Sequence, residues 1–427
     1  MGRSAIVVGA GIGGLAVTRG LAQSGWQVGL YERAPAFGTV GAGLAIEPNA
    51  VRALDWLGLG QRLRARGLRQ GPAGLRTARG RWLVRTRLEA LHERFGTPAF
   101  ALHRADVHQL LADGLAEHPA VTLHTSHRAT TATTSATHAA VTFQGPEGPV
   151  TAEADLVVAA DGVHSATRSA LFPHHPPPAY AGYITWRAIV PVEQAAGIPL
   201  DAAVVESWGR GRRVGVVPLP DGRVYWFFTE SAPEGAQQHA TVADLADRVG
   251  DWHAPIPQLL AATPSGALLR NDIYTLLAPL PSYRHGRVVL LGDAAHAITP
   301  DLGQGAALAL EDAVTLTIYA GHATSADPDL DAGLGRYDRE RRPRTQRLVR
   351  ISAFIGRIGQ ARNPLAVAAR NLAAGLLPAS AYLRASAGAF SWTPPTPEDT
   401  ATNAHDPGTE RAPCRPGGLS RSRHKAP

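Results

Sequence analysis

The sequence has 427 residues, of which 44% are hydrophobic and 18% charged, a composition typical of a globular protein with about two domains. A single cysteine, Cys414, excludes an intrachain disulfide, and no apolar run reaches the roughly 18–20 residues of a membrane span. Of the formal charge of +7, residues 411–427 contribute five cations and no acid, so the charge does not indicate nucleic-acid binding. We expect a cytoplasmic protein with no metal site, no nucleic-acid partner and no membrane partner.

The first 32 residues predict a strand, a glycine turn, a helix and a second strand. The turn is "GAGIGG" at 9–14, and the second strand ends at Glu32. In such a turn Gly9 permits the tight bend, Gly11 admits a pyrophosphate close to the backbone, and Gly14 lets the helix pack on the strand. The pattern therefore predicts a dinucleotide site in which Glu32 binds ribose hydroxyls.

A second strand–turn–helix unit is predicted at 154–171, "ADLVVAADGVHSATRSAL", where the strand runs into Asp161 and Gly162. Taken alone, this is an ordinary strand–helix connection. Because the carboxyl ends of parallel strands meet at one edge of a sheet, Asp161 is expected near the ligand of the glycine turn.

The pattern changes at residues 180–192 and 203–230, which are rich in β-branched and aromatic residues and predict an inserted antiparallel sheet. "PDG" at 220–222 predicts the turn between two strands. If the loop there has three residues, each residue of the first strand pairs with the residue of the second strand for which the two residue numbers add up to 442, as Val217 and Tyr225 do. This register places Arg213 and Tyr225 on one face of the sheet. A two-residue loop would place them on opposite faces.

The segment 292–313, "GDAAHAITPDLGQGAALALEDA", leads from a strand into a helix. The turn Gly303-Gln304-Gly305 opens that helix, so its N–H groups form a positively polarised end. His296 in this segment is expected to be structural or close to the cofactor. Residues 336–390 read as helical, and the Pro-, Thr- and Arg-rich segment 391–427 reads as a disordered basic tail.

Three motifs in this order, "GAGIGG…YER", "DGVHSATR" and "GDAAHAITPDLGQGAALALEDA", resemble the single-component FAD-dependent aromatic hydroxylases, the p-hydroxybenzoate hydroxylase-like flavin monooxygenases. The resemblance runs from about residue 4 to about residue 360. It implies an α/β fold: a Rossmann-like FAD-binding domain with an inserted antiparallel β-sheet substrate domain and C-terminal helices. Residues 1–72, 104–178 and 281–390 would form the FAD-binding part and the C-terminal helices, and residues 73–103 and 179–280 the substrate domain.

The resemblance also implies which residues meet the cofactor. "VGAGLAIEPNAVRALDWLGL" at 40–59 is similar to the second FAD loop of the family, and Asp293 matches the residue that binds the FAD ribityl chain. The expected cofactor contacts are Gly9, Gly11, Gly14, Glu32, Arg33, Ala45, Arg104, Asp161, Asp293, Gly303, Gln304 and Gly305.

The implied activity is hydroxylation of a small aromatic or heteroaromatic substrate with NADH or NADPH and O2, through a flavin C4a-hydroperoxide. NADH or NADPH would bind transiently, since the chain has no second complete dinucleotide fingerprint. Alternatives are an epoxidase or oxidative tailoring enzyme for a larger substrate, and a non-catalytic FAD-fold binding protein. A monomer or a homodimer is expected.

Arg213, Tyr225 and Asp301 are the expected catalytic residues. Arg213 and Tyr225 would hold the substrate, and Asp301, next to the Gly303-Gln304-Gly305 turn, would take its proton. The spacing of these residues is similar to that of FAD-dependent urate hydroxylases, although Arg187 stands where those enzymes have Asn. Alternatively, Arg213 is a surface charge and Tyr225 a packing ring.

Overall fold

A computed structural model describes residues 2–38, 42–70, 73–86, 89–200, 204–322 and 330–396. Residues 2–394 belong to one compact unit. Most of the tail predicted as disordered lies outside the described residues. None of the described helices is both long enough and apolar enough to cross a membrane.

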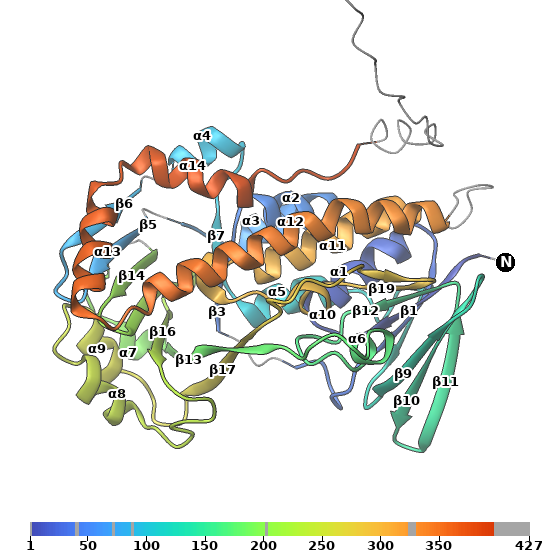
Figure 1. The fold of residues 1–427 in the computed structure, drawn as a ribbon, viewed down its shortest axis with the longest axis horizontal. Helices are drawn as coiled ribbons and strands as arrows, with labels where there is room; N and C mark the ends of the chain where they lie inside the picture. Colours follow the sequence, from blue (N-terminus) through green and yellow to red (C-terminus); the bar gives the residue numbers. More distant parts are fainter. Residues whose placement is uncertain are drawn as a thin grey trace, which may run out of the picture. The chain divides into compact units, whose positions relative to one another are not determined.

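A six-stranded sheet carries the predicted nucleotide-binding units, as Figure 1 shows. Its order is β18-β19-β12-β1-β2-β8, and every pair is parallel except β18–β19. The strands, in that order, span Arg284–His285, Val288–Leu290, Leu156–Ala159, Ser4–Val8, Gln27–Tyr31 and Val121–His124. The carboxyl ends of β1, β2 and β12 therefore meet at one edge, as the sequence predicts.

A second, seven-stranded sheet has the order β17-β13-β16-β15-β14-β5-β6. Neighbours are antiparallel, as the sequence predicts, except β14 and β5, which run parallel. Its strands span Leu269–Thr275, Ala179–Val190, Val224–Ser231, Arg212–Pro218, Val204–Trp208, Ala73–Thr77 and Trp82–Arg85.

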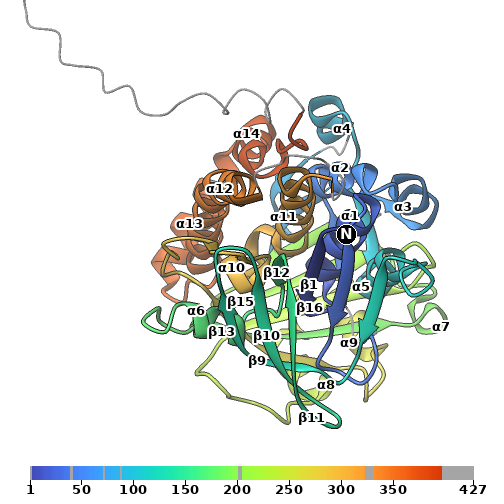
Figure 2. The same cartoon turned by 90° about the vertical axis from the view of Figure 1, so that its right-hand side faces the viewer.

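The other strands of the described residues form two three-stranded sheets. One has the order β3-β7-β4, with bounds Gly43–Ile46, Phe100–His103 and Leu68–Arg69. The other, β11-β10-β9, spans Gly148–Ala154, Ala139–Gly145 and Arg128–Thr134, and no motif of the sequence predicted it. Figure 2, turned by 90°, shows this sheet beside the nucleotide-binding strands.

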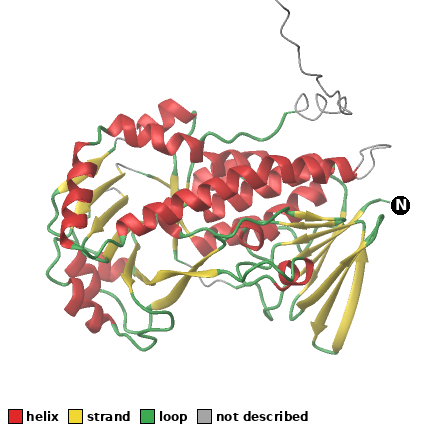
Figure 3. Cartoon of the chain, viewed as in Figure 1, coloured by secondary structure: helices red, strands yellow, loops and turns green. Residues whose placement is uncertain are grey.

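Helices cover the sheets, as Figure 3 shows in red. The first eight helices are α1 to α8, at Ile12–Gln23, Pro48–Trp56, Gly60–Arg66, Glu89–Phe95, Arg104–Ala112, Ala166–Leu171, Val192–Ala195 and Val242–Val249. The remainder are α9 to α14, at Ile256–Ala261, Asp293–His296, Gly305–Ala320, Leu330–Gly359, Pro364–Leu376 and Ala379–Phe390, and one 3-10 turn, η1, at Pro300–Leu302.

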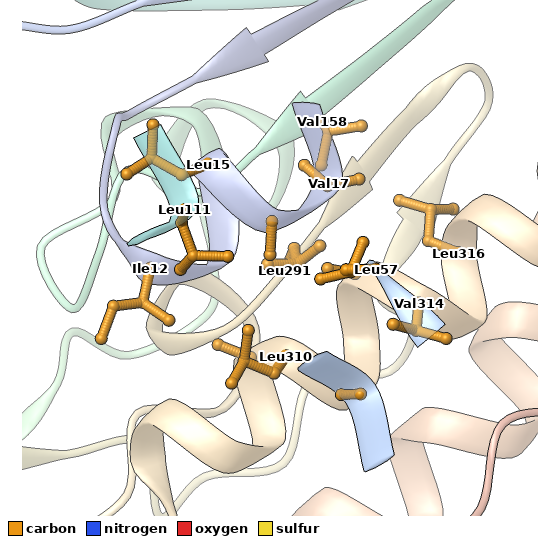
Figure 4. Close-up of a cluster of buried hydrophobic side chains, with 14 of the residues drawn as sticks. Ile12, Leu15, Val17, Leu57, Leu111, Val158, Leu291, Leu310, Val314 and Leu316 are labelled. Carbon is orange, nitrogen blue, oxygen red and sulfur yellow. The ribbon is translucent and has the colours of Figure 1, made fainter. Parts of the chain in front are cut away.

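The main core lies between the nucleotide-binding sheet and helix α11. Figure 4 shows Leu15 and Val17 of α1 packed with Leu291 at the end of β19 and with Leu310 and Val314 of α11. Every one of these side chains is at most 1% exposed. A Cβ on Gly292, which follows β19, would lie 3.2 Å from the Ala309 side chain, so the first turns of α11 lie close to the carboxyl end of β19.

Candidate active site

The glycine turn has the geometry that a bound pyrophosphate needs. Gly9 has φ of +98°, a backbone conformation that favours glycine, and its N–H donates to Tyr31 O at 2.7 Å. A Cβ on Gly14 would lie 1.8 Å from Gly9 O, so only glycine lets α1 pack this closely. A Cβ on Gly11 would meet nothing within 4 Å, so the backbone there is open to a ligand.

Glu32 lies next to this turn. Its carboxylate accepts hydrogen bonds from Ala10 N at 2.7 Å and from Ala34 N at 2.9 Å. The acid is therefore fixed at the carboxyl end of β2, where a ribose would follow the pyrophosphate. Arg33, the next residue, is exposed.

Arg104 and Asp293 share a second part of the site. Both are exposed to solvent, yet burial among protein atoms raises the pKa of the Asp293 carboxyl, against the effects of His296 and Arg104. Burial also lowers the pKa of Arg104, assisted by Arg187. Asp293 at the start of α10 suits the hydroxyls of a sugar-like chain. Ala45 lies on β3, which pairs with β7, the strand that ends just before Arg104.

The turn before α11 presents backbone donors. Gly303 is left-handed, with φ of +65°, and Gln304 is the N-cap of α11, with Gly305 the first helical residue. The first N–H groups of a helix have no partner within it, and they favour an anion or an electron-rich carbonyl. Asn49 donates to the Gln304 side chain at 2.9 Å and holds it, whereas the buried Gln304 Nε2 has no hydrogen-bond partner in the described residues.

Asp161 has a local role in its loop. It accepts hydrogen bonds from Ser165 Oγ at 2.6 Å and from Thr167 N at 3.1 Å, and so stabilises the first turn of α6. This contact does not test the expected link between Asp161 and the cofactors, which stays a prediction.

Below the turn, a buried network of charges joins α10, α11 and α12. His296 Nε2 lies 2.5 Å from Asp312 Oδ2, and Arg341 Nε donates to Asp312 Oδ1 at 2.7 Å. Burial alone would raise the pKa of Asp312, but His296 and Arg341 outweigh it and lower the pKa to about 2. His296 is 2% exposed and tied to this network, which fits the expected structural role.

The residues predicted to hold the substrate lie on one face of the seven-stranded sheet. The observed pairs are Arg213–Thr229 and Val217–Tyr225, which confirms the predicted register and the three-residue loop. Trp226 and Phe228 lie on the opposite face, in the core beneath α8 and α9. The face that carries Arg213 and Tyr225 also carries Tyr183, Arg187 and Glu206, by the alternation of paired strands.

Arg213 lies between two carboxylates. Its Nη2 is 2.6 Å from Asp301 Oδ1 and its Nη1 is 3.3 Å from Glu206 Oε1. Burial acts to lower the pKa of Arg213, but Glu206 and Asp301 outweigh it and raise the pKa above its ordinary value. The guanidinium is therefore charged and already paired, and it is not the surface charge of the alternative interpretation.

Both oxygens of Asp301 face a polar group, although the 2.6 Å ion pair of Oδ1 with Arg213 is not aligned as a hydrogen bond. Oδ1 meets Arg213, and Oδ2 accepts a hydrogen bond from Tyr183 Oη at 2.8 Å. Its side chain is fully shielded, whereas that of Glu206 is 29% exposed. Burial raises the pKa of Glu206, against the effect of Arg213. The sequence analysis did not include Tyr183 and Glu206. The alternation of side chains between the two faces of a strand was the one signal that could have placed them on the face of Arg213.

Tyr225 lies further along the same face, against Gly43 of β3. Burial raises its pKa to about 12, although Arg187 opposes this, so its hydroxyl is a neutral donor at physiological pH. The Phe227 ring lies over Gly215, where a Cβ would be 2.1 Å from the ring. Arg187 donates to Asn271 at 2.5 Å, and its buried Nε has no hydrogen-bond partner among the described residues.

Comparison with known proteins agrees with this geometry. Residues 3–352 match the model of the FAD binding domain family. The aurachin C monooxygenase/isomerase of Stigmatella aurantiaca is 36% identical over 373 residues, which cover 86% of this chain and 92% of that protein. An FAD-dependent urate hydroxylase of Klebsiella pneumoniae is 34% identical over 355 residues, covering 81% and 87%.

A solved structure shows the same fold. Klebsiella pneumoniae HpxO complexed with FAD and uric acid superposes with a TM-score of 0.82 at 29% identity, covering 91% of this chain and 97% of that one. The chain belongs to the FAD binding domain family and is an FAD-dependent monooxygenase of the hydroxylase type. The predicted fold class, cofactor and enzyme class are thus confirmed.

Proposed function

We propose that this enzyme uses NADH or NADPH and O2 to hydroxylate a small aromatic or heteroaromatic ring that carries a weakly acidic O–H or N–H group. When bound, FAD accepts electrons from the nicotinamide and activates oxygen. The ring would lie against the sheet face of Arg213 and Tyr225, in a substrate part formed by residues 73–103 and 179–280. We further propose a cytoplasmic monomer or homodimer.

The observation that carries this proposal is the buried contact of Arg213 with Asp301, next to the N-terminus of α11. Asp301 and Glu206 already balance the charge of Arg213. A substrate with a full negative charge would meet these carboxylates as well as the arginine, and repulsion would offset the attraction. A neutral, weakly acidic substrate avoids this cost.

Proton transfer then keeps the charge of the site constant. The substrate O–H or N–H bond breaks, its proton passes to Asp301, and its electron pair stays on the ring. Because Asp301 becomes neutral, Arg213 can pair with the substrate anion instead. Both oxygens of Asp301 are engaged, so the substrate has to displace Tyr183 or Arg213 from one of them. Tyr225 donates a hydrogen bond to another polar atom of the ring.

A substrate panel tests this function. Phenols, hydroxypyridines, quinolones and purines are offered to the FAD-loaded enzyme, each beside its O- or N-methylated analogue. We expect at least one parent compound to stimulate NADH or NADPH oxidation and to gain one oxygen atom by mass spectrometry, and its methylated analogue to do neither. Oxidation without any oxygenated product across the panel would contradict the proposal.

A further inference from the structure

Helix α13 exposes its leucines and buries an arginine, the reverse of the usual arrangement of a helix on a protein surface. Leu365, Leu372 and Leu376 are 81%, 64% and 75% exposed, whereas Arg370 is 7% exposed. The three leucines follow the spacing i, i+7 and i+11 and so lie on one face. A surface helix normally buries its apolar face and exposes its charges. The exposed face of α13 therefore fits an apolar environment rather than water.

The orientation of α13 is fixed by Arg370. This side chain donates to Gly359 O at 2.9 Å and to Gly209 O at 3.0 Å, and it lies over the Trp208 ring at 5.2 Å. It thus links α13 to the end of α12 and to the seven-stranded sheet. Because the anchor is on the inward face, the helix cannot turn its leucines inward without breaking these hydrogen bonds.

A second set of exposed apolar side chains lies near the end of α12. Ile351 and Ile358 are each 36% exposed, and Phe354 is 60% exposed. Their spacing of i, i+3 and i+7 places them on one face of that helix. We name these three residues, with the three leucines of α13, the α12–α13 apolar surface.

The charged side chains of the chain segment from residue 341 to residue 396 are all cationic. The exposed side chains of Arg347, Arg350 and Arg357 lie on the same helix as Phe354, and exposed Arg384 follows on α14. No acidic residue occurs in the sequence between Glu340 and Glu398. An apolar helix face bordered by arginines is the pattern of a helix that lies in the surface of an anionic membrane.

We propose that the α12–α13 apolar surface docks on anionic lipid bilayers, which makes this monooxygenase a peripheral membrane protein. The expectation of no membrane partner rested on the lack of a spanning segment, but a surface helix needs none. With 13 residues, α13 is too short to span a bilayer and long enough to lie in its surface. A second copy of the chain is a less suitable occupant, because a symmetric contact would bring the two sets of arginines together.

Vesicle co-sedimentation tests this proposal. The FAD-loaded enzyme is mixed with vesicles of phosphatidylcholine alone or with added phosphatidylglycerol. We expect binding to the anionic vesicles that weakens with salt. In the variant Leu365→Gln, Leu372→Gln, Leu376→Gln, binding should fall at least about tenfold, since the apolar contribution is lost. The FAD spectrum and NADH or NADPH oxidation with a soluble substrate should stay unchanged.

A matched control comes from exposed apolar residues elsewhere. Val150, Val192 and Leu277 are 42%, 42% and 39% exposed, and their replacement by Gln should leave vesicle binding intact. Equal loss in both triple variants, or no vesicle binding by the parent, would overturn the proposal. So would a parent dimer that the leucine variant converts to a monomer without any vesicle binding, because a second copy would then cover the surface.

Discussion

Asp301 shares one buried cluster with Arg213, Tyr183 and Glu206, and its neighbours determine what it can do. Arg213 and Tyr183 each engage one of its oxygens. A Cβ on Gly356 of α12 would lie 2.6 Å from Oδ2, so the helix backbone covers the carboxylate. Asp301 is thus fixed in place by three elements, and a substitution that preserves its shape tests its charge alone.

Asp301→Asn should keep substrate binding largely intact and slow hydroxylation by about 100-fold or more, because an amide cannot take the substrate proton. More NADH or NADPH should then be oxidised without product. The measurement is product formed per NAD(P)H consumed, with Glu206→Gln as the comparison at the other carboxylate of Arg213. Unchanged coupling in Asp301→Asn would remove this residue from the proton transfer.

At the scale of elements, two glycines of the glycine turn have different roles, one in folding and the other in cofactor binding. Gly14 is required by the contact of α1 with the turn, whereas Gly11 faces open space. Two chemically equal substitutions, three positions apart, should therefore have different consequences.

Gly11→Ala should fold normally and bind FAD more weakly, because the added methyl group occupies the space that the pyrophosphate needs. Gly14→Ala should lose stability by several kcal/mol, since its Cβ would overlap Gly9 O. Thermal unfolding of the FAD-free proteins and FAD titration of each variant measure the two effects. Equal unfolding temperatures in the two FAD-free variants would contradict this assignment.

The same elements show how far the sequence could be interpreted. The glycine turn, Glu32 and the register of β15 on β16 follow from local patterns, because a turn type sets the pairing of its own strands. The Arg213–Asp301 contact does not, since it depends on how η1 lies against a sheet that is distant in sequence. The contacts of Tyr183 and Glu206 with this pair and the contact of Asn49 with Gln304 likewise depend on tertiary packing, although strand alternation gives the sheet face on which Tyr183 and Glu206 lie. The pairing of β5 with β14 also had no local signal.

At the scale of the whole molecule, the charges around Asp312 tie the segment that carries Asp293 to α11 and α12. The pKa of Asp312 is about 2, below its ordinary value of 3.8, so folding favours the ionised carboxylate. A group of this kind stabilises the fold above its unfolded pKa, and the contribution is lost as pH falls through the folded value.

Asp312 should therefore contribute about 2 kcal/mol of pH-dependent stability that is complete above about pH 4 and disappears toward pH 2. Urea unfolding between pH 5 and pH 3 measures it. Asp312→Asn should be less stable at pH 5, because the buried carboxylate between His296 and Arg341 is lost and Arg341 keeps only Glu311 as an ionised partner. Its stability should also depend less on pH in this window. Parallel curves for the parent and the variant would contradict the role of Asp312.

Deletion of residues 397–427 should leave folding and turnover nearly unchanged. This segment is rich in Pro, Thr and Arg and has few apolar residues that could join a core. The unfolding temperature and the rate of NADH or NADPH oxidation with substrate check this. A large loss of either would mean that the tail is part of the functional enzyme.

The aromatic ring of Phe227 stacked over Gly215 has a consequence for the evolution of the family. The two positions form one steric unit, because a methyl group at 215 would lie 2.1 Å from the ring. A relative with Ala or a larger residue at 215 would need a smaller or differently directed residue at 227, so the two alignment columns should covary. Lineages that exchange this pair together would change the shape of this face of the sheet without altering Arg213, Tyr225 or Asp301. If the substrate lies there as proposed, such a change is a route to new ring substrates with the same chemistry.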